Sequence, residues 1–228
     1  MSFLREEVGE AGLKEREENK LDLKYLEIYA YADPAAGKDA KNKAHGARQA
    51  IVVGARDGLD RWFFLLTWAG RETTSDFKEK ILQTYEIYKP RLFGIEANGM
   101  QVLFGNLVRE EAKVRFGRIK MIPIYQPTNV EKNFRIRTGL EPLIMQGKLF
   151  LLGESLEARV ELRGFPTAQT KDIVDAMETC VRMAPKRPVS LMVDEEIKQY
   201  EKYLRSSRTP AHLIEKKVGE FKRLRLED

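Results

Sequence analysis

The stretch Leu-Glu-Ile-Tyr-Ala-Tyr-Ala-Asp, residues 26–33, is an apolar run that ends in a carboxylate. A second apolar run, residues 92–96, ends in the same way at Glu96. Burial of an unpaired carboxylate is costly, so packing alone does not explain an acid at the end of a core strand. Asp33 and Glu96 are therefore predicted to share a site at the ends of neighbouring strands.

Two further acids, Asp172 and Asp175, lie three residues apart at the start of a predicted helix. At that spacing they point to roughly the same helix face, with Cβ atoms about 5–6 Å apart. Mg²⁺ and Mn²⁺ prefer oxygen ligands, and two such ions can clamp a phosphodiester for hydrolysis. The four acids together predict a two-metal nuclease site.

Each acid also has a plainer interpretation. Asp172 can cap its helix or meet the helix dipole. Glu96 precedes a predicted turn, and Asp33 precedes Pro34, a position typical of turn-forming acids. Asp175 is the hardest to explain in this way, because its neighbours in the helix are apolar.

Composition limits the class of protein. Hydrophobic residues make up 43% of the 228-residue chain, which is enough for one substantial α/β domain with extensions. The sequence contains neither a membrane-spanning apolar run nor a signal-peptide pattern. The single cysteine, Cys180, permits no disulfide within the chain and is expected in the core. An intracellular protein is expected.

The charge pattern suggests a partner. The net charge is +5, and residues 205–225 are rich in Lys and Arg, a composition that could follow a phosphate backbone. A solvated amphipathic helix is the alternative. Residues 1–24, rich in Glu and Lys, are interpreted as a linker or peripheral helix.

Periodicity predicts an α/β order of elements. Strands are expected at about 25–33, 48–54, 61–68, 91–96 and 120–125, and helices at 74–88, 100–115, 131–146, 155–163, 171–184 and 194–204. The Asp57-Gly58 pair favours a hairpin between the second and third strands. A short apolar run, 148–152, is noted without a place in the sheet.

The expected fold is a mixed five-stranded sheet, with its first three strands antiparallel and helices on both faces. Trp62 and Trp68 are expected to share one face of the third strand as core residues. In the helix at 100–115, Leu103 and Leu107 are expected on the apolar face, with Phe104 and Val108.

This layout resembles the RNase-H-like nucleases of the RuvC-type branch, and more closely the C-terminal nuclease domain of the large terminase subunit of tailed bacteriophages. The segments that carry the resemblance are Tyr31–Pro34, Gly94–Gln101, Arg135-Ile136, Leu140–Leu143, Gly147-Lys148, Phe165-Pro166 and Lys171–Ala176. They cover about 26–180, most of the chain.

The resemblance implies a metal-dependent endonuclease that cleaves double-stranded DNA during viral genome packaging. It implies two divalent cations, Mg²⁺ or Mn²⁺, held by Asp33, Glu96, Asp172 and Asp175, with Asp33 bridging the ions. Either Asp172 or Asp175 could ligate directly. The residues expected to contact DNA, unless they form solvated surfaces, are Lys38, Lys41, Lys43, Arg48, Lys132, Arg135 and Arg137.

The resemblance also implies a domain plan and partners. Residues 1–24 would be a linker remnant, 25–188 the nuclease domain and 189–228 a helical basic extension, with the ATPase motor absent. The partners would be DNA and, in a full-length protein, the motor domain, the portal and the small terminase subunit, in the cytoplasm of an infected bacterium. The alternatives are a RuvC-like junction resolvase or recombination nuclease, and a non-catalytic module that docks DNA or a portal.

Overall fold

The computed structural model describes the chain in five stretches, and side chains within 189–196 and 222–226 are not described. The stretches are 26–34, 48–152, 155–186, 189–206 and 209–226. Within them, no helix is long and apolar enough to cross a membrane.

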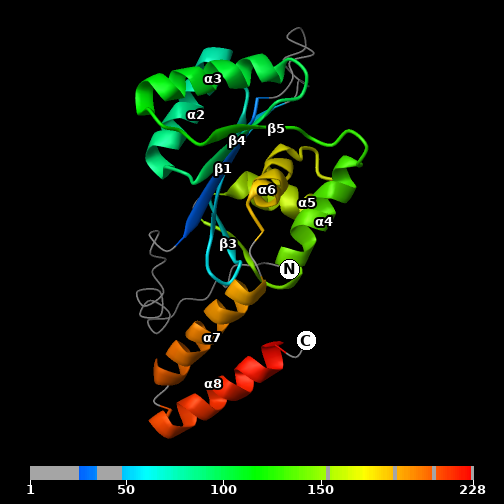
Figure 1. The fold of residues 1–228 in the computed structure, drawn as a ribbon. Helices are drawn as coiled ribbons and strands as arrows, with labels where there is room; N and C mark the ends of the chain where they lie inside the picture. The colour runs from blue at the N-terminus through cyan, green and yellow to red at the C-terminus, as the bar shows by residue number, and fades with distance from the viewer. Residues whose placement is uncertain (1–25, 35–47, 153–154, 187–188, 207–208, 227–228) are drawn as a thin grey trace, which may run out of the picture. The chain divides into compact units, whose positions relative to one another are not determined.

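Six strands form one mixed sheet with the order β5-β4-β1-β2-β3-β6. The strands are β1 (Glu27–Asp33), β2 (Gln49–Arg56), β3 (Trp62–Gly70), β4 (Leu92–Glu96), β5 (Met121–Ile124) and β6 (Leu149–Leu151). β1, β2 and β3 form an antiparallel meander, whereas β4 and β5 continue the sheet parallel to β1. This mixed sheet, with its first three strands antiparallel, is the arrangement that the sequence predicts (Figure 1).

The predicted number of strands is wrong by one. The short run at 148–152 forms β6, which pairs parallel to β3 at the edge of the sheet. Phe63 of β3 stacks on Phe150 of β6 with ring centroids 4.9 Å apart. A strand of three residues is too short to show a period, so pairing with β3 decides its structure.

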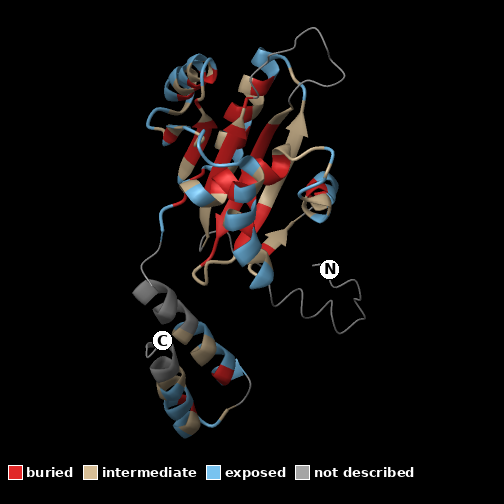
Figure 2. Cartoon of the chain, turned by 90° about the vertical axis from the view of Figure 1, so that its right-hand side faces the viewer, coloured by how far each residue is buried: buried red, intermediate tan, exposed pale blue. Residues whose placement is uncertain are grey.

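Helices cover both faces of the sheet (Figure 1). They are α2 (Thr74–Tyr88), α3 (Gln101–Phe116), α4 (Lys132–Met145), α5 (Leu156–Gly164) and α6 (Asp172–Met183). α2 and α3 pack on one face, where they form a core cluster with the small side chains Ala30 and Ala32 of β1. α4, α5 and α6 pack on the other face, against Tyr29 and Tyr31. Figure 2 shows buried residues concentrated in the strands and in α6.

The alternation of β1 determines the position of its terminal acid. Tyr29 and Tyr31 lie on the face that α6 covers, and successive strand residues point to opposite faces. Asp33 therefore belongs to the α6 face. Cys180 of α6 is buried on the same face, as expected, and burial raises the pKa of its thiol to about 12.

The predicted common face for the two tryptophans is wrong. Trp62 packs in the cluster under α6, whereas Trp68 packs in the cluster under α2 and α3. The cause is a β-bulge: Val53 of β2 pairs with Leu66, but the next residue pairs with Phe64. One extra residue in β3 reverses the faces of all residues that follow it.

The chain divides into two compact units, one comprising 1–56 and 61–184 and the other comprising 57–60 and 185–228. In the second unit, α7 (Val189–Ser206) and α8 (Ala211–Leu226) pack as a helical hairpin. Tyr200 stacks on Phe221 with ring centroids 4.6 Å apart.

Candidate active site

Asp33 and Glu96 lie side by side at the carboxyl ends of two adjacent parallel strands. Ala32 of β1 pairs with Ile95 of β4, and each acid is the next residue of its strand. Ala32 and Ile95 face α2 and α3, so the two acids turn to the opposite, α6-covered face. Gln101 Nε2 lies 3.5 Å from Asp33 Oδ1 at the rim of this site.

α6 brings the second pair of acids to the same edge. Its first turn carries Asp172, which is half-buried, and Asp175, which is only 8% exposed. α6 packs across β1 and β2, close to the ends of the strands that bear the first two acids (Figure 1).

A buried carboxylate from α5 caps α6. Glu161 Oε2 accepts hydrogen bonds from the backbone N–H groups of Ile173 at 2.9 Å and Val174 at 3.0 Å. Burial raises the pKa of Glu161, while these two N–H groups act in the opposite direction. The capping role of Glu161 is not predictable from the sequence, because nothing local connects this residue with a helix that begins eleven residues later.

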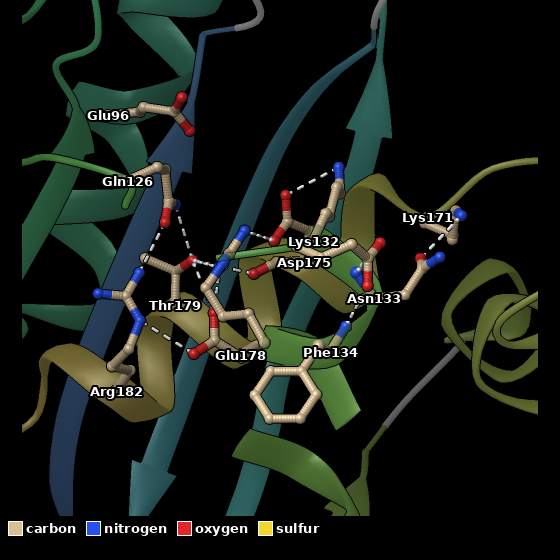
Figure 3. A network of polar contacts seen from close by, with 12 residues as sticks. Glu96, Gln126, Lys132, Asn133, Phe134, Lys171, Asp175, Glu178, Thr179 and Arg182 are labelled. Carbon is tan, nitrogen blue, oxygen red and sulfur yellow. Dashed lines mark hydrogen bonds and ion pairs between the residues drawn. The ribbon is translucent and has the colours of Figure 1, made fainter. Parts of the chain in front are cut away.

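Two basic side chains form ion pairs with the two carboxylate oxygens of Asp175. Lys132 Nζ lies 2.8 Å from Asp175 Oδ2, and the Arg135 guanidinium lies 2.5 Å from Asp175 Oδ1. Figure 3 shows the contact of Lys132 with Asp175. Arg135 also forms an ion pair with Glu178, and Arg48 Nε lies 3.9 Å from Asp172 Oδ2.

The lysine lies within the electrostatic field of all four acids. Burial lowers the pKa of Lys132, but the charges of Asp175, Asp172 and Asp33 outweigh it and raise that pKa. The positive charge of Lys132 in turn lowers the pKa of Glu96. The four acids thus share one neighbourhood, and a cation already sits in it.

Two of the acids, Glu96 and Asp172, have raised pKa values, so their charged forms are disfavoured. Burial raises the pKa of Glu96, and the charge of Asp175 adds to this, against the hydrogen bond from Tyr31. Burial also raises the pKa of Asp172, against the opposing charges of Lys132 and Arg48. Raised carboxyl pKa values indicate a site that positive charge would stabilise.

Within the described stretches, no three acidic, histidine or cysteine side chains form a group that could hold a metal ion. The reason is visible in the contacts: Lys132 and Arg135 hold Asp175, and Tyr31 donates to Glu96. The donor chemistry nevertheless fits a hard divalent cation, because all four groups are carboxylates.

The predicted DNA contacts have different environments. Lys38, Lys41 and Lys43 lie outside the described residues. Lys132 and Arg137 are exposed on α4, whereas Arg135 is 8% exposed and engaged with acids. The Arg48 side chain is 13% exposed and contacts Glu157 at 3.0 Å. Contact with DNA stays a prediction for all seven residues.

A scan of the sequence against protein-family models finds no match, and a search of curated proteins finds none either. The structure is similar to the nuclease domain of the large terminase of phage P22, at 14% identity and a TM-score of 0.46. That similarity covers 69% of this chain and 82% of the P22 domain.

Two further solved structures are similar. One is the large terminase nuclease domain of bacterial virus Sf6 with manganese, at 9% identity, TM-score 0.43, and coverage of 70% of this chain and 89% of that one. The other is Thermus thermophilus RuvC with a Holliday junction substrate, at 11% identity, TM-score 0.39, and coverage of 68% and 90%. At these values none of the similarities decides the chemistry, which rests on the residues of the site.

Proposed function

We propose that the chain is a metal-dependent endonuclease that hydrolyses phosphodiester bonds of double-stranded DNA with two divalent cations. The observation that carries this proposal is the placement of Asp33 and Glu96, on adjacent parallel strands, near the acids of α6, with Lys132 paired to Asp175 and its charge acting on the other three acids. Four carboxylates in one neighbourhood serve no packing purpose and cost desolvation energy. Such an arrangement is typical of sites that bind positive charge for chemistry.

Asp33, Glu96, Asp172 and Asp175 would hold the ions, Mg²⁺ or Mn²⁺. When bound, the ions would supply activation of a water for attack on phosphorus and stabilisation of the leaving 3′ oxygen. The charge of Lys132 lowers the pKa of Glu96 and of Asp172, against the effect of burial, and so favours their ionised forms before the substrate arrives. Asp33 and Glu96 are fixed by the sheet, and Asp172 and Asp175 by the capped first turn of α6.

Lys132 has a separate part in this proposal. It blocks Asp175 Oδ2 while the site lacks a metal ion, and it must release that oxygen for Asp175 to become a ligand. Its side chain is 46% exposed on a flexible stem, so the ammonium can move toward a DNA phosphate. Arg135 cannot move in this way, because it is buried between Asp175 and Glu178.

The biological setting is part of the same proposal. In a large terminase subunit this activity would cut viral DNA at packaging, beside a motor domain, a portal and a small subunit. A RuvC-like resolvase would use the same acids, but it would cleave four-way junctions in preference to linear duplex. A docking module would bind DNA and leave it intact.

The test is plasmid cleavage by the purified chain in Mn²⁺, Mg²⁺, Ca²⁺ or EDTA, with Asp33→Asn and Asp175→Asn beside the wild type. Glu141→Gln, an exposed acid on α4, is the matched control. Cleavage in Mn²⁺ or Mg²⁺ that both site variants lose and the control keeps supports the proposal. Intact plasmid under every condition, with DNA binding retained, would favour the docking module. Selective cleavage of four-way junctions would favour the resolvase.

A further inference from the structure

A chain of hydrogen bonds ends on Glu96, and the mechanism above does not use it. Arg182 donates to Gln126 Oε1 at 2.7 Å, and Gln126 Nε2 donates to the Tyr31 hydroxyl at 2.9 Å. The Tyr31 hydroxyl donates to Glu96 Oε2 at 2.8 Å. Figure 3 shows Gln126 between Arg182 and Glu96. The chain thus connects the last turn of α6 with the acid at the end of β4.

The arginine determines the direction of this chain. A guanidinium group only donates hydrogen bonds, so the side-chain oxygen of Gln126 must face Arg182. The Gln126 nitrogen therefore faces the other way, and it has two further partners for its two hydrogens: the Tyr31 hydroxyl and Thr179 Oγ1, at 2.9 Å. The Thr179 hydroxyl in turn donates to the Asp175 carbonyl oxygen at 3.0 Å.

Tyr31 passes this direction on to the acid. Its hydroxyl has a single hydrogen, and because it accepts from Gln126, that hydrogen is directed to Glu96 Oε2. Tyr31 is 1% exposed, so its ring is held firmly in the core. Glu96 is thereby held as an acceptor with Oε2 fixed, and its other oxygen keeps its capacity to bind a cation.

The origin of the chain, Arg182 in the last turn of α6, is exposed, but a buried acid of the same helix anchors it. Arg182 Nε donates to Glu178 Oε1 at 2.9 Å, and Glu178 is 1% exposed. The other oxygen of Glu178 holds Arg135, which binds Asp175. One network therefore fixes acids on both β4 and α6.

We propose that Gln126 and Tyr31 are positioning residues that orient Glu96 for cation binding, Tyr31 through its hydroxyl and Gln126 both through that hydroxyl and through its own hydrogen bond to Glu96. The proposal rests on the proposed metal-dependent function, and it predicts that the two residues act as one unit. Neither residue needs to touch the substrate. Partners of this kind behind metal ligands typically change metal affinity or activity by about 10–100-fold.

The experiment compares Tyr31→Phe, Gln126→Met and the double variant in the full chain. Two quantities are measured: Mn²⁺ binding, from the EPR signal of the free ion, and the Mn²⁺ concentration that gives half-maximal plasmid cleavage. Tyr29→Phe is the matched control, because Tyr29 is buried on the same face of β1 and its hydroxyl accepts a hydrogen bond from Arg56, a different residue from Glu96, 3.1 Å away. Thermal unfolding of each variant checks its fold.

Each single variant should weaken Mn²⁺ binding by about tenfold or more, with maximal cleavage affected less. The double variant should lose less than the product of the two single losses, since part of the effect of Gln126 passes through the hydroxyl that Tyr31→Phe already lacks. Tyr29→Phe should stay within about twofold of the wild type.

Additive losses in the double variant, or an equal loss in Tyr29→Phe, would overturn the proposal in favour of a purely structural role. Unchanged Mn²⁺ binding in both single variants would overturn it as well. Failure of the wild type to cleave DNA while it binds Mn²⁺ in a Tyr31-dependent way would count against the proposed nuclease, not against the positioning role.

Discussion

The ammonium of Lys132 lies 2.8 Å from Asp175 Oδ2, and its positive charge also acts on Asp172, Asp33 and Glu96. In the proposed function, this lysine competes with a metal ion for the same carboxylate oxygen. Its charge offsets part of the negative charge of the four acids in the metal-free protein, and the proposal predicts a measurable exchange of one cation for another.

Replacing Lys132 with Met should therefore strengthen metal binding and weaken the metal-free fold, because the four acids lose their counter-charge. The increase in melting temperature on adding Mn²⁺ should exceed that of the wild type by about 2–4 °C for each ~1 kcal/mol of additional binding energy. Differential scanning fluorimetry measures this. Lys120→Met, at an exposed position, is the control, and an equal Mn²⁺ response in all three proteins would disprove the competition.

The pH dependence of cleavage should follow the raised pKa values of Glu96 and Asp172. Both carboxyl groups must lose their protons to bind metal, so activity should fall on the acid side at a pH above the ordinary range for these residues. The charge of Lys132 lowers both pKa values, so Lys132→Met should move the acid limb to higher pH. Rates across a pH series at one subsaturating Mn²⁺ concentration test this, because protons then compete with the metal for both carboxylates, and a shift to lower pH would be the wrong sign.

Removing the cap of α6 should destabilise the domain. Glu161→Ala leaves the backbone N–H groups of Ile173 and Val174 buried without their acceptor, at a cost of about 1–3 kcal/mol. Urea denaturation gives the free energy of unfolding. Glu157→Ala on the same helix loses only a half-exposed ion pair and should cost less than about 1 kcal/mol. Equal costs would show that the Glu161 cap contributes nothing specific.

Gly139 of α4 should tolerate no side chain, although it lies within a helix. A Cβ there would lie 2.7 Å from Cγ of Glu178, whose carboxylate is fixed by two arginines. Gly139→Ala should therefore cost about 1–3 kcal/mol by overpacking, despite the better helix propensity of alanine.

Gly105 of α3 is the matched position, because its added Cβ would meet Ile95 at an ordinary 3.6 Å. Gly105→Ala should stabilise the domain by up to about 1 kcal/mol. The two free energies of unfolding should thus differ in sign, and a stabilising Gly139→Ala would contradict the tight packing around Glu178.

Local pattern predicts much of this fold. The helix expected at 74–88 is α2, because its apolar residues recur with a period of 3.6 on its buried face. The first three strands pair as expected, and they form continuous apolar runs because helices cover both faces of the sheet. The placement of Asp33 and Glu96 at strand ends needs only the end of each apolar run. Their adjacency follows from the parallel pairing of β1 with β4.

The buried face of α3 is determined by how the helix packs on the sheet, which the local sequence does not show. Leu103 and Leu107 were expected on the buried face of α3, but they are 64% and 63% exposed, and Gly105 and Ala112 lie against the sheet instead. Close packing there selects small residues, which a count of apolar positions overlooks.

The contacts of Gln126 could not be predicted for a similar reason. Its partners Tyr31 and Arg182 are remote in sequence and meet it only in the folded chain. The position of Glu178 could have been predicted from the sequence, because it continues the three-residue spacing of Asp172 and Asp175 along α6.

The most direct test of the central claim is anomalous diffraction at the manganese edge from crystals of the chain grown with duplex DNA and Mn²⁺. We expect anomalous peaks between the carboxylates of Asp33, Glu96 and Asp175, with the Lys132 ammonium displaced from Asp175 Oδ2. DNA bound at this edge of the sheet with no manganese between these acids, and Lys132 still paired with Asp175, would contradict it.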